Sequence, residues 1–183
     1  MSQLEKGPKI FGMSITFLEG LAAILTIAGS MGVFLAVWQY MQDARSLRVE
    51  RTLDYIERWE EGSARVSFEK LSDALAQEFS LIPAEEKAKA EEDDEFRARL
   101  LAKATNRILR EQQNEEAFHQ VVYFFNSLGL CLEGKICDAN TSKIFFKGTV
   151  NQFMEYFDDP LEEILASEVG YGSGLKLLAT KLE

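Results

Sequence analysis

Histidine and cysteine are scarce in this chain of 183 residues, which contains one histidine, His119, and two cysteines, Cys131 and Cys137. Nucleophilic catalysis and metal binding usually combine several such side chains. His119 lies beside Phe118 on an amphipathic helix without a nearby cysteine, so a partly buried, hydrogen-bonded histidine is favoured over a general base or metal ligand. The sequence therefore predicts no catalytic residue, no metal site and no cofactor.

The two cysteines lie six positions apart. If their domain lies in the cytoplasm, we expect two ordinary reduced thiols, which is the favoured interpretation. In a periplasm or lumen, the same spacing would allow the pair to close a small loop. A zinc site shared between two copies of the chain is a third alternative.

Basic residues are outnumbered, because 20 Lys and Arg face 30 Asp and Glu and give a net charge of -10. Residues 1–42 contribute nothing to this charge, since two lysines there balance two glutamates. The acidic excess therefore belongs to the remaining domain, where it repels nucleic-acid phosphates and anionic lipid. We expect no nucleic-acid partner, and instead proteins with basic or neutral surfaces.

Charge is absent from residues 20–42, which are mainly apolar or small. A bilayer core of about 30 Å needs about 20 helical residues, so this run predicts a single transmembrane helix over residues 17–41 after a short lead of residues 1–16. Thr16 and Glu19 have the spacing of a capping box at its start. A cleaved signal peptide is the alternative, but its apolar core would be shorter and followed by a small-residue cleavage site.

Two features of this run predict its contacts. Trp38 and Tyr40 are aromatic residues of the kind that anchor a helix at the headgroup boundary. A stripe of small residues would allow another helix, from a second copy or a foreign membrane subunit, to approach closely. This pattern is also common by chance. The stripe consists of Ala28, Gly29, Gly32 and Ala36.

The distribution of Lys and Arg indicates the orientation, since these residues concentrate on the cytoplasmic side. Lys6 and Lys9 precede the apolar run, whereas four arginines follow it at positions 45, 48, 51 and 58. The excess favours an N-terminus outside and a cytoplasmic C-terminal domain.

Helical periodicity dominates residues 42–183, and no convincing strand pattern occurs. We expect an all-α fold, in which the transmembrane helix continues to Glu61 and leads into a bundle of about five to six helices. The most apolar helix, around residues 118–132, should form the core. Asp138 should begin the next helix, and Asp159 before Pro160 a further short one. Residues 84–95 read as a solvated charged connection, and residues 170–183 as a flexible tail.

Aromatic residues exceed what a domain of this size must expose, and some are expected to form a docking face. The alternative is that the helices bury more than one stripe of side chains. The candidate residues of this docking face are Tyr123, Phe124, Phe146, Tyr156 and Tyr171.

Three segments together resemble an uncharacterised bacterial membrane family that is known only as a domain of unknown function. They are WQYMQDARSLRVERTLDYIERW, VVYFFNSLGLCLEGKICD and FFKGTVNQFMEYF, and the similarity in organisation covers residues 33–165. The resemblance implies a bacterial inner membrane, one N-terminal span and a cytoplasmic body, and it supplies no catalytic residues. The acidic connection and the glycine-broken tail depart from it.

These observations favour a non-enzymatic, single-pass membrane protein that acts through protein contacts. It would be an accessory or assembly subunit of a membrane complex, or a homo-oligomer, with membrane lipid and another membrane subunit or a second copy as its partners. A membrane-tethered sensor or effector in bacterial stress or defence signalling is the alternative, and an enzyme is a third option.

Overall fold

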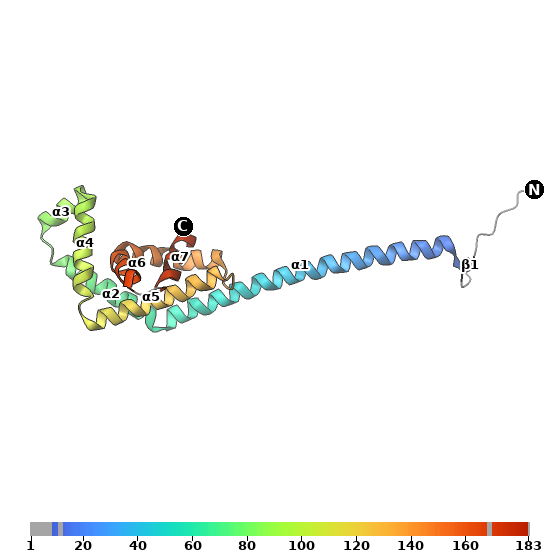
Figure 1. Cartoon of the computed structure of the whole chain (residues 1–183), viewed down its shortest axis with the longest axis horizontal. Helices are drawn as coiled ribbons and strands as arrows, with labels where there is room; N and C mark the ends of the chain where they lie inside the picture. The colour runs from blue at the N-terminus through green and yellow to red at the C-terminus, as the bar shows by residue number, and fades with distance from the viewer. Residues whose placement is uncertain (1–8, 11–12, 168–169, 183) are drawn as a thin grey trace, which may run out of the picture. The chain divides into compact units, whose positions relative to one another are not determined.

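The computed structural model describes residues 9–10, 13–167 and 170–182, with side chains for residues 31–166 and 170–182. Within these ranges the chain is helical, apart from a short antiparallel pair of strands, β1 (Lys9–Ile10) and β2 (Met13–Ser14). Contacts divide the chain into two units, Met1–Ser46 and Leu47–Glu183. Figure 1 labels the elements.

Helix α1 (Ile15–Glu61) runs through 47 residues without interruption. The absence of proline and glycine from its second half explains this continuity, because both residues weaken a helix interior. The predicted continuation to Glu61 is confirmed. The helix begins before the predicted Phe17, whereas the side chains of the expected capping box, of Ala28 and of Gly29 lie outside the described part.

The large apolar residues of α1 between positions 31 and 41 are all exposed. They include Trp38 and Tyr40, the predicted interfacial anchors, with exposed fractions of 56% and 75%. Gly32 has nothing within 4 Å of the position that a Cβ would take. Among the described residues, no helix reaches the length and apolar character needed to cross a bilayer.

The second unit is a helical bundle centred on α5 (Gln112–Glu133). Six of the large apolar residues of α5 are buried, as their helical spacing predicts, and the predicted end of the helix at Gly134 is confirmed. The end of α1, α2 (Ser63–Ser80), α6 (Ala139–Ser167) and α7 (Ser173–Leu182) pack against it. Helix α4 (Asp94–Ile108) packs against α2 and α6, and α3 (Ala84–Glu92) packs against α4 (Figure 1).

Trp59, near the end of α1, joins the helices through an aromatic cluster. Its ring centroid lies 5.1 Å from that of Phe125, 5.2 Å from that of Phe124 and 6.2 Å from that of Phe146. Phe146 is only 1% exposed. Its expected place on an exposed docking face is therefore wrong, because Phe146 belongs to the buried face of α6 together with Val150 and Phe153.

The charged segment at residues 84–95, expected as a solvated connection, is largely exposed and mainly helical, because it forms α3 and the start of α4. Alanine, glutamate and lysine are strong helix formers, and α3 consists of nothing else. Asp93 then begins α4, since its carboxylate accepts a hydrogen bond of 3.0 Å from the amide of Phe96. The Lys89 ammonium also lies 4.6 Å from the centre of the Phe96 ring.

Helix α6 begins where Asp138 predicted, because that carboxylate accepts a hydrogen bond of 2.9 Å from the amide of Thr141. The helix then continues through Pro160, so the expected fresh start at Asp159 is wrong. Proline removes one backbone hydrogen bond from a helix interior. Burial of Pro160 and of its neighbours Phe157 and Leu161 in the core offsets that loss.

The C-terminal segment is part of the core and not a flexible tail. Leu175, Leu178 and Leu182 on α7 are fully buried against the bundle. Two glycines permit this packing, because a Cβ on Gly129 of α5 would lie only 1.8 Å from the carbonyl oxygen of Gly174 on α7. The backbones of the two helices are therefore in direct contact.

Cys131 and Cys137 form a disulfide, with their Cα atoms 5.3 Å apart. This corrects the expectation of two reduced thiols and matches the small loop considered as an alternative. The loop leads into Asp138, whose amide donates a hydrogen bond of 2.8 Å to the hydroxyl of Thr52 on α1. The disulfide therefore holds a loop that is tied to α1.

Candidate docking groove

One exposed stripe of α5 has the three-four spacing of a helix seam and no helix packed over it. Its positions are exposed apart from Ser127, which is half-buried. Tyr123 and Leu130 are its apolar members, with exposed fractions of 73% and 50%. The stripe consists of Gln113, Glu116, Gln120, Tyr123, Ser127 and Leu130.

Three surface hollows follow this stripe. The central one has a volume of about 850 Å³ and lies between α5, the last turns of α1 and the start of α2. It shares Tyr55 and Ser127 with a hollow of about 430 Å³ toward Leu130, and Ser63 and Gln120 with one of about 460 Å³ toward Gln113. We call this continuous depression the α5 groove.

Hydrogen bonds fix the walls of the α5 groove. Tyr55 on α1 donates to the carbonyl oxygen of Ser127 at 3.3 Å, and the hydroxyl of Ser67 on α2 donates to the side chain of Gln120 at 2.7 Å. The Lys70 ammonium donates to the carbonyl oxygen of Gln113 at 3.1 Å. Each of these bonds joins α5, the floor of the groove, to α1 or α2, which form its walls. The groove is therefore formed without a ligand.

The centre of the α5 groove is acidic and aromatic. Asp54, Glu57 and Glu61 line it, and none of them forms an ion pair within the described ranges. The single cation there is Arg58, whose guanidinium lies 5.5 Å from the centre of the Tyr55 ring. Three carboxylates against one guanidinium give the central hollow a formal charge of -2.

The structure divides the predicted aromatic docking residues. Tyr123 and the half-buried Phe124 both line the central hollow. Tyr156 and Tyr171 are half-buried against the core and do not line the groove. Tyr55 and the three carboxylates were not among the predicted docking residues, because they enter the groove from α1. The three-four spacing of exposed positions along α5 could have indicated the groove from the sequence.

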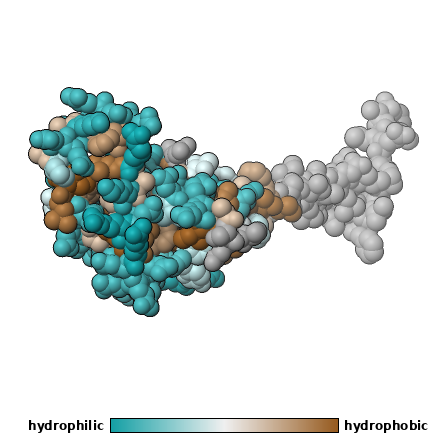
Figure 2. All heavy atoms as spheres, turned by 60° about the vertical axis from the view of Figure 1, so that its left-hand side comes forward, coloured by the Kyte–Doolittle hydropathy of each residue, from teal (hydrophilic) through white to brown (hydrophobic). Residues whose placement is uncertain are grey.

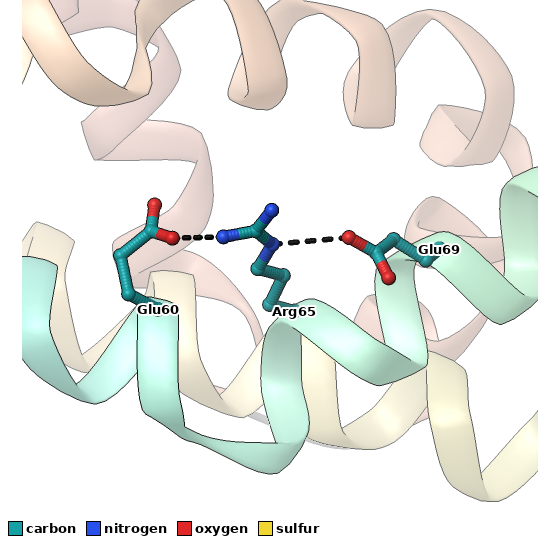
Figure 3. A network of polar contacts seen from close by, with 3 residues as sticks. All are labelled: Glu60, Arg65 and Glu69. Carbon is teal, nitrogen blue, oxygen red and sulfur yellow. Dashed lines mark hydrogen bonds and ion pairs between the residues drawn. The ribbon is translucent and has the colours of Figure 1, made fainter.

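The turn between α1 and α2 positions the two walls. It needs a glycine, since a Cβ on Gly62 would lie 2.1 Å from the carbonyl oxygen of Arg58. Arg65 spans this turn, pairing with Glu60 before it and, at 3.0 Å, with Glu69 after it (Figure 3). All three side chains are substantially exposed, so they contribute little to stability but restrict the geometry.

Exposed apolar side chains also occur elsewhere on the domain. The view in Figure 2 shows a mainly hydrophilic face with distinct hydrophobic patches. Ile144 and Phe145 on α6 are exposed by 80% and 53%, and Phe145 borders a hollow of about 280 Å³ beside Arg65. This hollow is smaller than the centre of the α5 groove, and no free carboxylate pair accompanies it.

His119 hydrogen-bonds through Nδ1 to the hydroxyl of Tyr171, and its ring is half-buried. The prediction of a hydrogen-bonded, partly buried histidine is confirmed. Across the described part of the chain, no group of three or more His, Cys, Asp or Glu side chains is arranged to hold a metal ion.

Two of the ion pairs that join helices away from the groove shift the pKa of one of their members. The hydrogen bond and charge of Lys181 on α7 lower the pKa of Glu133 on α5, where the two side chains approach to 2.9 Å. The hydrogen bond and charge of Glu78 raise the pKa of Arg107 above its ordinary value, across the 2.6 Å contact between α2 and α4. Both pairs are structural and distant from Tyr123.

Residues 26–168 match the model of the family described as a domain of unknown function (DUF4760). No curated protein and no solved structure matches the chain.

Proposed function

The chain belongs to the family known as the domain of unknown function DUF4760, which assigns no function to it. From its own sequence and structure, we propose that it is a non-enzymatic, single-pass membrane protein acting through protein contacts. It would serve as an accessory or assembly subunit, or as a homo-oligomer. The α5 groove is the observation that carries this proposal, because it presents aromatic, charged and hydrogen-bonding groups in a fixed arrangement. Such a surface is typical of protein recognition.

Membrane attachment is supported by the uncharged sequence of residues 20–42 and by the exposed apolar side chains of α1 from Met31 to Met41. A helix that is apolar on all sides requires a protein interior or a lipid environment. We propose the bacterial inner membrane. The small-residue stripe at Gly32 and Ala36 supplies a second contact surface there.

Two observations bear on orientation. The four arginines after the apolar run support a cytoplasmic domain and an external N-terminus, which we propose. The Cys131–Cys137 disulfide is the observation against it, because disulfides persist mainly in oxidising compartments. Alkylation of the cysteines in intact cells distinguishes these placements. If Cys131 and Cys137 react directly, their thiols are reduced and the cytoplasmic placement of the domain is supported. If they react only after a reductant is added, the domain lies on the opposite side of the membrane.

Copurification tests the proposed function. The full chain, extracted from native membranes in a mild detergent, should carry a stoichiometric protein partner or further copies of itself. Carbonate washing should leave it in the membrane pellet. A monomeric particle without partners would refute a contact-based role, and release by carbonate would refute the membrane span. Thermal stabilisation by a small-molecule ligand would instead favour the alternative of a membrane-tethered sensor in stress or defence signalling.

A further inference from the structure

We propose that the α5 groove binds an amphipathic helix of a partner protein, with basic side chains at the centre of that helix. This inference rests on the proposed contact-based function and specifies the partner. The required features are the length of the groove, the spacing of its floor, its central charge and its fixed walls.

The dimensions of the groove fit a helix. Its floor extends from Gln113 to Leu130 on α5, and a rise of about 1.5 Å per residue makes this about 26 Å long. The exposed positions alternate by three and four residues, which is the spacing at which two helices pack side by side. An extended peptide would not match this periodicity, because its side chains alternate every two residues.

The charge at the centre of the groove favours basic side chains on the middle of a bound helix, whereas Arg51 and Lys70 line its two ends. Asp54, Glu57 and Glu61 form one wall at the centre of the groove, and within the described residues they have no ion-pair partner. Lysine or arginine side chains of a bound helix would pair with these carboxylates and lie against the ring of Tyr123. A second copy of this chain is disfavoured as the occupant, since its net charge of -10 would place like charges together.

The walls need no rearrangement to accept a helix. The hydrogen bonds of Tyr55 to Ser127 and of Ser67 to Gln120 already join α1 and α2 to α5. Binding to a preformed groove avoids the entropic cost of ordering its walls. Tyr123 and Leu130 then serve as the apolar anchors, because they are the exposed apolar residues on the floor.

Two synthetic helices of 18 residues test the proposal with the purified full chain in detergent. Both would carry the same Leu and Ala stripe, one with lysine and arginine on its flanks and the other with glutamate. Fluorescence anisotropy should show the basic helix binding about tenfold more tightly or better, with an affinity that falls as salt is raised. Equal affinities would overturn the charge assignment.

Matched variants locate the binding. Y123S and E57K should each weaken the basic helix by about tenfold, and E57K should improve binding of the acidic helix. L81S removes an exposed apolar side chain and E155K reverses an exposed charge at positions outside the groove, and both should leave binding unchanged. Equal losses in the two sets of variants would refute binding in the groove. Circular dichroism of each variant shows whether it has folded.

Copurification separates this inference from the proposed function. If the wild-type chain brings a stoichiometric protein from membranes and the Y123S/E57K variant brings the same amount, the groove assignment fails while the contact-based function stands. Loss of that protein from the double variant, with retention by L81S/E155K, supports both. Recovery of the wild-type chain as a monomer without partners refutes the contact-based function, whereas its recovery as a homo-oligomer without a foreign protein overturns the groove assignment alone.

Discussion

Replacing Gly129 with alanine tests the packing of α7 on α5. The added methyl group would lie 1.8 Å from the carbonyl oxygen of Gly174, and only backbone movement can relieve that contact. Overpacking of this kind costs about 1–3 kcal/mol. Complete release of α7 would cost more, because it would expose Leu175, Leu178 and Leu182, each worth about 1.5–3 kcal/mol when fully buried. We therefore expect partial displacement of α7.

Gly148 provides the matched control. It lies exposed in the middle of α6, and nothing is within 4 Å of the position of its added Cβ. G148A should stabilise the domain by about 0.5–1 kcal/mol through helix propensity alone. Since G129A gains the same propensity and incurs the clash, the free energies of unfolding of the two variants should differ by about 1–3 kcal/mol.

Urea unfolding followed by tryptophan fluorescence measures this difference. Trp59 is buried in the aromatic cluster and reports unfolding, while the exposed Trp38 can be replaced by phenylalanine in all variants. Limited proteolysis should also cut G129A near residue 170 sooner than G148A. If G129A is as stable as G148A within about 0.5 kcal/mol, the close contact between α5 and α7 does not exist.

Three further predictions concern other contacts. C131S should lower the free energy of unfolding by about 2 kcal/mol under non-reducing conditions, as expected for opening a loop of about seven residues, and addition of a reductant should bring the wild type to the same value. K181Q should raise the pKa of Glu133, measured by NMR, toward its ordinary value. Because the pair lowers the pKa of Glu133 in the folded state, its contribution to stability is present above the unfolded-state pKa and is lost as the pH falls through the folded-state pKa. The free energy of unfolding should therefore fall less on acidification in K181Q than in the wild type. R65A should lower the free energy of unfolding, measured in urea, by less than about 1 kcal/mol, since Arg65 and its partners are exposed. A larger decrease would contradict the conclusion that these ion pairs contribute little to stability.

Periodicity predicted the parts of the fold in which one helix face is apolar. The continuation of α1 to Glu61, the buried helix α5 and the start of α6 after Asp138 all follow from local signals. Local signals failed where tertiary packing decides the outcome. Pro160 reads as a helix start, yet burial of Leu161 keeps α6 continuous.

Helix α7, which was expected as part of a flexible tail and is buried in the core, illustrates the same limit. Glycines at positions 170, 172 and 174 predict a break in the chain, and two of them do support a turn, with φ angles of +90° and +68° at Gly170 and Gly172. Gly174 has a different role, because it allows α7 to touch the backbone of Gly129. A residue that contributes by having no side chain leaves no trace in hydrophobic periodicity.

The composition of the α5 stripe also indicates how the groove is used. Only Tyr123 and Leu130 are apolar, whereas the other four exposed or half-buried positions are polar. A permanently covered seam would be mainly apolar, since buried polar groups cost free energy unless they are paired. A seam with two apolar anchors in polar surroundings remains soluble when it is empty. The α5 groove therefore fits a partner that associates reversibly better than one that is an obligate part of the folded domain.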